Sequence, residues 1–240
     1  VYKRQMFKEA SSFNQNIGNW DTSGVTEING MFFGTTVFNQ DLSNWCVTNI
    51  SNESPDFATN SALTKANKPV WGTCPSNTTT STTGTTTSTT GTTTPTGGGN
   101  TGTTTSTGNG GNNSGTTTST ASLIYFENGT CKCPNASVGD TATISGTVYT
   151  VVDNLTIAGQ IANGNYNLCT TLATYMTELF VDNTSFNSDI SFWDMSNVTN
   201  TDRMFQGASS FNQDIGGWNT SKFYDVSGMF KDASNFNQNI

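Results

Sequence analysis

The chain has 240 residues, of which only 11% are charged and 32% are hydrophobic, and it contains no histidine. Its net charge is −8 and it has no basic run, which argues against a nucleic-acid partner because phosphate binding needs clustered Lys and Arg. No stretch approaches the roughly 18 apolar residues of a membrane span. A chain this polar buries several small cores, where its apolar residues cluster, rather than one large core.

A 25-residue repeat occupies both ends of the chain. Met6-Phe7 recurs as Met31-Phe32, and Met204-Phe205 recurs as Met229-Phe230. Residues 1–5 do not follow this period. Because several positions share one period, we expect the repeated aromatic residues to lie in a common interior. These residues are Phe13, Trp20, Phe38, Trp45, Phe186, Trp193, Phe211 and Trp218.

Each unit combines two local patterns. Asp21-Thr22-Ser23 precedes apolar residues three or four positions apart, at Val25, Ile28 and Phe32, which predicts a short capped amphipathic helix. Residues 13–20 predict a short extended segment that ends in a turn. A helix and a strand in 25 residues form one coil of a solenoid, so the predicted fold class is α/β, with stacked coils in two arrays.

The chain divides into four predicted segments. Residues 1–77 are the C-terminal end of a first array with a Cys-containing cap, and residues 78–120, which are Thr, Gly, Ser and Asn with one Pro, are a disordered linker. Residues 121–172 are a Cys-containing N-terminal cap, and residues 173–240 are a second array, truncated within a repeat. We therefore expect the chain to be a piece of a longer protein.

The cap at 121–172 contains two local signals. Residues 142–144 and 147–151 flank Ser145-Gly146, which predicts a β-hairpin. Asp153 then precedes Leu155, Ala158 and Ile161, and Gly164 follows, which predicts a short helix with a defined start and end.

Cysteines flank both caps. We expect Cys46 to pair with Cys74, because this bond would clamp the capping segment over the open end of the first array; two free buried cysteines are the alternative. We also expect either Cys131 or Cys133 to form a disulfide with Cys169. The sequence leaves the choice between them open, and we name Cys133 as the candidate. Zinc is disfavoured, since no histidine and no C-x-x-C pair is present.

The other polar residues indicate structure rather than chemistry. The asparagine after each repeated Phe could bond the backbone of the next coil as a buried ladder; these residues are Asn14, Asn39, Asn187 and Asn212. The recurring aspartates could bind calcium, but asparagine takes equivalent places, so turn capping explains them equally well. No nucleophile lies in a recognisable catalytic motif, so we expect no catalytic residue, no cofactor and no metal.

One motif describes the repeat unit: Met-Phe-x-x-Ala-x-x-Phe-Asn-Gln-x-Ile-x-x-Trp-x-x-Ser-x-Val. It occurs from Met6 to Val25 and again from Met204 to Phe223, where Phe223 replaces the last Val. This motif resembles the repeat of BspA-like leucine-rich-repeat bacterial surface proteins. Residues 45–75 resemble that family's C-terminal cap, and residues 152–170 resemble the start of a new array. The resemblance implies a leucine-rich-repeat-like solenoid, secretion or surface attachment, and a role in adhesion. It supplies no catalytic residues.

We therefore expect a non-enzymatic, secreted or cell-surface protein that mediates adhesion, with a protein or glycan on a cell or matrix surface as its partner. One alternative is a structural spacer or matrix protein without a specific ligand. A carbohydrate-active β-solenoid is a further alternative, which the lack of a defined carboxylate pair disfavours.

Overall fold

The computed structural model describes residues 2–75 and 123–240, which belong to one compact unit. The predicted linker at 78–120 lies outside the described residues and stays a prediction, as do the boundaries proposed for the other segments.

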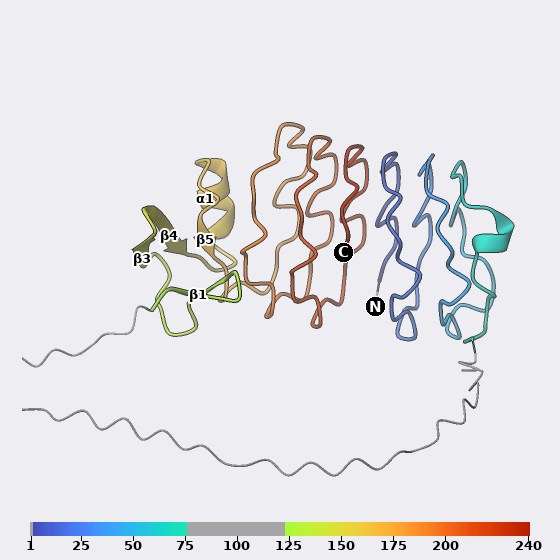
Figure 1. Ribbon diagram of the computed structural model, residues 1–240, viewed down its shortest axis with the longest axis horizontal. Helices are drawn as coiled ribbons and strands as arrows, with labels where there is room; N and C mark the ends of the chain where they lie inside the picture. Colours follow the sequence, from blue (N-terminus) through green and yellow to red (C-terminus); the bar gives the residue numbers. More distant parts are fainter. Residues whose placement is uncertain (1, 76–122) are drawn as a thin grey trace, which may run out of the picture. The chain divides into compact units, whose positions relative to one another are not determined.

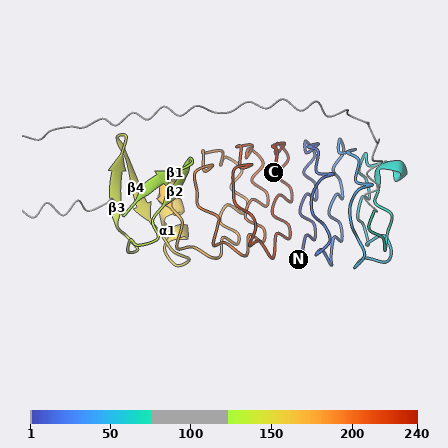
Figure 2. The same cartoon turned by 60° about the horizontal axis from the view of Figure 1, so that its bottom comes forward.

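Regular strands gather in the cap of the second array (Figure 1). A two-stranded antiparallel sheet pairs β1 (Tyr125–Glu127) with β2 (Thr130–Lys132), as Figure 2 also shows. A three-stranded mixed sheet has the order β3-β4-β5. In this sheet β3 (Thr141–Ile144) is antiparallel to β4 (Thr147–Val151), and β4 is parallel to β5 (Leu168–Cys169).

The prediction of an α/β leucine-rich-repeat-like solenoid, with a short strand and a short helix in each coil, is wrong. Helix in the described residues is limited to α1 (Ile157–Ala162) and the 3-10 helix η1 (Lys65–Asn67). The repeat units instead consist of turns joined by isolated parallel bridges, such as the one between Tyr175 and Asn200. Within residues 2–75 and 123–240, no helix has the length and apolar character needed to cross a membrane.

Backbone hydrogen bonds explain why the predicted helix at 25–32 does not form. Met31 N–H donates to the carbonyl oxygen of Ile28, three residues earlier, at 3.1 Å. The next amide, Phe32 N–H, donates to the carbonyl oxygen of Phe57 in the following unit at 2.8 Å. An α-helix needs each amide to donate within its own segment, so this alternation between turn and neighbouring unit excludes it.

Left-handed backbone recurs at two places in each unit, four residues apart. The angle φ is +59° at Gly30 and +69° at Gly34, and the equivalent places in the preceding unit hold Gln5 at +53° and Glu9 at +59°. A right-handed helix cannot pass through such residues. The apolar spacing of three or four residues therefore comes from successive tight turns, which point their side chains inward as a helix would.

The predicted hairpin of the cap is confirmed as β3 and β4. Thr143 lies opposite Val148 in the register, and the connecting residues Ser145 and Gly146 have φ of +51° and +84°. Positive φ at both central positions is the geometry of a type I′ turn, which matches the twist of antiparallel strands.

The short helix predicted after Asp153 is present as α1, although it is shorter than expected. Asp153 Oδ1 accepts the backbone N–H groups of Leu155 and Thr156 at 3.0 Å each. Ile161 is buried, as expected for the inner face, but Leu155 precedes the helix and its side chain is 89% exposed. The Asp153 turn therefore lies ahead of the helix and orients its first turn.

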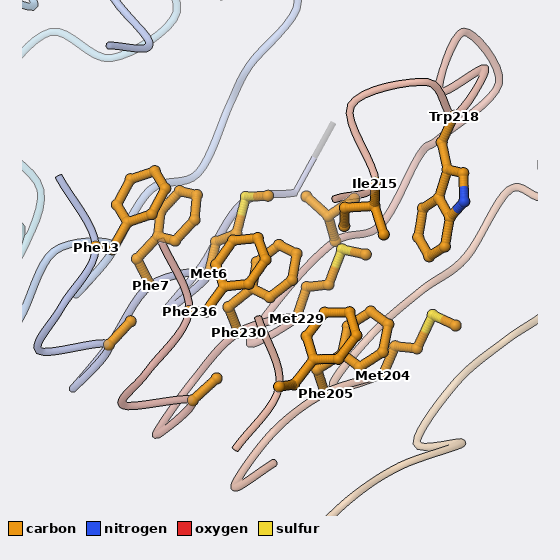
Figure 3. Packing of buried hydrophobic residues seen from close by; sticks show 14 of the residues in the cluster. Met6, Phe7, Phe13, Met204, Phe205, Ile215, Trp218, Met229, Phe230 and Phe236 are labelled. Atoms are coloured by element: carbon orange, nitrogen blue, oxygen red, sulfur yellow. The ribbon is translucent and has the colours of Figure 1, made fainter. Parts of the chain in front are cut away.

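Phenylalanine rings from both arrays form one continuous column in the core (Figure 3). Successive rings of Phe180, Phe205, Phe230, Phe7 and Phe32 are stacked, with centroids 5.5, 5.6, 5.8 and 5.7 Å apart. Phe230 belongs to the second array and Phe7 to the first. The column therefore passes without a break from one array to the other.

The contact between residues 221–240 and residues 2–20 is called the junction below. Phe230 N–H donates to the carbonyl oxygen of Met6 across it at 2.8 Å. The corresponding bond within the second array, from Phe205 N–H to the carbonyl oxygen of Met229, measures 2.9 Å. The junction thus repeats the contact that joins neighbouring units within one array.

Candidate binding surfaces

The predicted aromatic core positions all pack in or against the hydrophobic core. The Phe13 and Phe38 ring centroids are 5.7 Å apart, and those of Phe186 and Phe211 are 5.6 Å apart. All four phenylalanines are buried, as are Trp45, Trp193 and Trp218, while Trp20 is partly buried. These rings are inaccessible to a sugar, so the repeated aromatic positions do not form a surface strip.

Asparagine side chains link neighbouring units in a ladder. Asn187 Oδ1 accepts the backbone N–H of Asn212 at 2.9 Å, and Asn14 Oδ1 accepts that of Asn39 at 3.2 Å. At the junction Asn237 Oδ1 accepts the N–H of Asn14 at 3.0 Å. These asparagines lie at the surface, in contrast to the buried ladder that we expected. The ladder therefore joins neighbouring units near their surface.

The recurring aspartates close local turns. Asp21 Oδ1 accepts the side-chain hydroxyl and the backbone N–H of Ser23, and these hydrogen bonds lower the pKa of Asp21. The backbone N–H of Ser43 similarly lowers the pKa of Asp41. Among residues 2–75 and 123–240, no three His, Cys, Asp or Glu side chains gather as a metal-binding group. In this part of the chain, no such cluster supports the calcium alternative.

The expectation of disulfides is confirmed, since the structure contains two. One joins Cys46 to Cys74, and the other joins Cys133, just after β2, to Cys169 in β5. Cys131 is a buried free thiol. Burial and then the negative charge of Asp194 raise the pKa of Cys131 to about 12.

Three aromatic rings form a partly exposed group on the cap, called the cap cluster. Phe126 of β1 and Tyr149 of β4 meet edge to face with centroids 5.1 Å apart, and Phe192 lies 5.6 Å from Tyr149 and 6.1 Å from Phe126. Phe126 is 38% exposed. Aromatic rings in mutual contact at a surface are typical of interaction sites.

The cap cluster is held by contacts between the cap and the first unit of the second array. Cys131 N–H donates to the carbonyl oxygen of Phe192 at 2.9 Å, and Lys132 Nζ donates to Asp194 Oδ1 at the same distance. Asp194 Oδ2 accepts the hydroxyl of Thr171 at 2.8 Å. The Asp194 side chain is 2% exposed, so its charge depends on these partners.

Sequence reasoning did not identify the cap cluster. Tyr149 belongs to the predicted hairpin, but Phe126 lies before it and Phe192 lies one residue before a repeated tryptophan. Phe192 also departs from the repeat, because the equivalent residue next to Trp218 is Gly217. That departure is the one available signal that this unit makes an additional contact.

A cavity of about 530 Å³ opens at the junction. Apolar side chains from both arrays line it, among them Met6, Trp20, Trp218 and Met229. The ammonium group of Lys3 lies 5.0 Å from the Trp20 ring centroid, and burial lowers the pKa of Lys3 to about 8. Polar side chains also line it, among them Asp21, Thr220 and Ser221.

A family model described as "Mycoplasma protein of unknown function, DUF285" matches residues 2–90 and 152–240. The chain belongs to this family. The two matched stretches contain the two repeat arrays, so each array corresponds to a copy of the DUF285 model. No curated protein matches the chain. No solved structure matches it either.

Proposed function

We propose that this chain is a non-enzymatic, secreted or cell-surface interaction module that binds a protein or a glycan through the cap cluster. The observation that carries the proposal is the mutual contact of Phe126, Tyr149 and Phe192 at the surface. Leaving such apolar area in water is unfavourable by about 25 cal/mol per Å², and aromatic residues are enriched where binding energy concentrates.

Preorganisation supports the same conclusion. The Cys133–Cys169 disulfide and the Lys132–Asp194 ion pair fix β2 against β5 and the first repeat unit. A surface that is rigid before binding loses less conformational entropy when its partner docks. The stacked units behind the cap provide the stiff support for it.

An extracellular location is supported by two observations. The two disulfides are typical of oxidising compartments. The repeat motif also resembles that of BspA-like bacterial surface proteins.

The test uses the purified full chain on a glycan array and on immobilised collagen, fibronectin and laminin. We expect saturable binding to at least one of these probes. Phe126→Ser should weaken it about tenfold or more, because truncating an aromatic anchor commonly costs more than 1 kcal/mol. Leu155→Ser is the matched control, since Leu155 is 89% exposed and lies outside the cluster.

No saturable binding to any probe would contradict the proposal and favour a structural spacer. Equal binding by Phe126→Ser and the unmodified chain would contradict the role of the cap cluster. Release of sugar from an arrayed glycan would contradict the non-enzymatic assignment.

A further inference from the structure

Strand β3 forms an open edge of the cap's three-stranded sheet. The strand order is β3-β4-β5, and within residues 2–75 and 123–240 no segment pairs with the second side of β3. Both views place β3 at the margin of the cap (Figures 1 and 2). Its residues, Thr-Ala-Thr-Ile, include no charge and no proline, the residue types with which proteins commonly prevent pairing at an exposed edge. The edge is therefore suited to accepting a further strand.

Backbone groups of two threonines in β3 face away from β4. Val151 N–H donates to the carbonyl oxygen of Asp140 at 2.9 Å. Hydrogen-bonded and non-hydrogen-bonded pairs alternate along an antiparallel ladder, so the next pair, Thr141 with Thr150, is non-hydrogen-bonded. In agreement, Thr150 N–H donates away from β3, to the segment that leads into β5, at 3.0 Å. The N–H and C=O groups of Thr141, and by the same alternation those of Thr143, therefore point to the free edge.

One face of β3 continues the apolar surface of the cap cluster. Ala142 lies directly opposite Tyr149, a member of the cluster, and Ile144 follows on the same face. Both β3 residues are half-buried and pack against the core that holds the Cys133–Cys169 disulfide. Because Ala142 carries only a methyl group, little side-chain volume separates the free edge from the Tyr149 ring. A strand paired with β3 places alternate side chains on this face, and the one opposite Ala142 extends toward Tyr149.

The charge beside the edge indicates the chemistry of the partner. The charged residues of the cap, 123–172, are Glu127, Lys132, Asp140 and Asp153. Lys132 is the one cation among them, and it is paired with Asp194. Asp140 directly precedes β3, is exposed, and forms no ion pair with the described residues. A partner with a basic residue at this end of the edge is therefore complementary in charge.

We propose that β3 binds an extended segment of another protein by strand addition, with an apolar side chain of that segment opposite Ala142 and a basic one beside Asp140. The inference rests on the proposed function, because it names a polypeptide as the partner of the cap cluster. Thr141 and Thr143 exchange backbone hydrogen bonds with the segment, and its apolar side chain packs toward Tyr149. Free N–H and C=O groups at strand spacing match a peptide backbone, which favours a polypeptide over a glycan.

The probe is the peptide Thr-Val-Thr-Phe-Thr-Lys-Thr with acetyl and amide ends. Antiparallel pairing places its Val opposite Ile144, its Phe opposite Ala142 and its Lys opposite Asp140. Titrated into the isotope-labelled full chain and followed by NMR, it should bind saturably and slow hydrogen exchange at the amides of Thr141 and Thr143. Without peptide these two amides should exchange rapidly, because they face solvent. No binding, or slow exchange of these amides in the free chain, would overturn the proposal.

A second peptide separates strand addition from binding through side chains alone. It has the same sequence, with methyl groups on the backbone nitrogens of the two threonines that flank Phe, so it cannot donate to the carbonyl oxygens of Thr141 and Thr143. It should bind at least about tenfold more weakly. Equal affinity of the two peptides would show that no strand is added.

Variants of the chain test the same edge. Thr143→Pro removes an outward N–H and should weaken peptide binding about tenfold, whereas Thr143→Val keeps this group and should bind as the unmodified chain does. Unfolding midpoints show whether each variant is folded. Equal binding by folded Thr143→Pro and Thr143→Val would contradict the proposal. If Thr143→Pro does not fold, the two peptides still decide.

Phe126→Ser separates this inference from the proposed function. If Phe126→Ser weakens binding to a glycan or matrix probe while Thr143→Pro does not, the cap cluster binds its partner without β3, and strand addition is wrong. If Phe126→Ser leaves binding of every probe unchanged while the methylated peptide still binds weakly, the edge pairs with a strand and the role of the cap cluster is wrong.

Discussion

Lys132 of β2 and Asp194 of the first repeat unit form an ion pair with Nζ and Oδ1 2.9 Å apart. The Asp194 side chain is 2% exposed and the Lys132 side chain 23%, so the pair lies largely within the contact between cap and array. It joins the segment that carries Phe126 to the unit that carries Phe192, the two ends of the cap cluster.

Replacing Asp194 should therefore destabilise the protein. Asp194→Asn removes the charged acceptor of Lys132 and should lower the free energy of unfolding by about 2 kcal/mol, the usual effect of losing a hydrogen bond to a charged group. Urea denaturation measures this loss. Asp189→Asn is the control, since Asp189 is exposed and should change stability by less than about 0.5 kcal/mol. Similar losses of unfolding free energy in both variants would show that the Lys132–Asp194 ion pair does not stabilise the protein more than an exposed aspartate does.

The contribution of Asp194 should also depend on pH. Burial raises the pKa of Asp194, but the combined hydrogen bonds from Lys132, Ser196 and Thr171 outweigh it and leave the pKa below its ordinary value of 3.8. A carboxyl group with a lowered folded pKa stabilises fully above its unfolded pKa and loses that effect as the pH falls through the folded pKa. The difference in unfolding free energy between the unmodified chain and Asp194→Asn should thus be constant above about pH 5 and shrink below pH 3.8. A difference that grows with acidification would contradict the assignment.

Gly18 lies where the backbone of the next unit approaches closely. A Cβ atom at this residue would lie 2.5 Å from the carbonyl oxygen of Asp41 in the next unit. Gly18→Ala should therefore force the units apart and lower the free energy of unfolding by about 2 kcal/mol, as overpacking does. Gly24→Ala is the matched control, because a Cβ atom there meets nothing within 4 Å. Thermal unfolding of both variants compares them, and equal midpoints would contradict the prediction.

The asparagine ladder should contribute modestly at each step. Asn39 Oδ1 accepts the backbone N–H of Thr64 at 2.9 Å and the side-chain amide of Asn67 at 3.0 Å. Asn39→Ala should lower the free energy of unfolding by about 1 kcal/mol and speed hydrogen exchange at the Thr64 amide. Asn44 is also exposed, and Asn44→Ala should have little effect on either measurement. Unchanged exchange at Thr64 in Asn39→Ala would count against the ladder.

The thiol of Cys131 should be inert in the folded protein. It is buried, and burial together with the charge of Asp194 raises its pKa to about 12, so almost no thiolate exists at neutral pH. Without a reductant, a thiol reagent such as DTNB should react negligibly before unfolding and with one thiol per chain afterwards, because the other four cysteines form disulfides. Prompt reaction of the native chain would show that the cap opens readily.

The interior could be predicted from the sequence more reliably than the backbone. Phe38 and Phe211 recur with the period of their units, and a residue that repeats in register must meet its equivalents whatever the local conformation. The predicted helix failed because apolar residues three or four apart arise both from a helix and from successive tight turns. Gly30 and Gly34 indicate the turns in the sequence, because glycine favours positive φ. Gln5 and Glu9 adopt the same positive φ in the preceding unit, but their residue types give no such signal.

The cap cluster and the junction cavity depend on contacts between distant segments, which one sequence does not reveal. Phe126 and Phe192 meet because β2 bonds to the first repeat unit, and neither residue forms a local pattern. The junction cavity arises where Phe230 stacks on Phe7, residues more than 200 positions apart. Its lining could be recognised only once the two arrays were known to share one column.

The alternation of backbone hydrogen bonds at 28–35 has an evolutionary consequence. Phe32 N–H donates to an acceptor 25 residues later, so a gain or loss of length in steps of 25 residues keeps the units in register. A deletion of another size shifts the aromatic residues of one unit out of register with those of the next. We therefore expect natural relatives to differ in the number of their units, while the length of each unit stays constant.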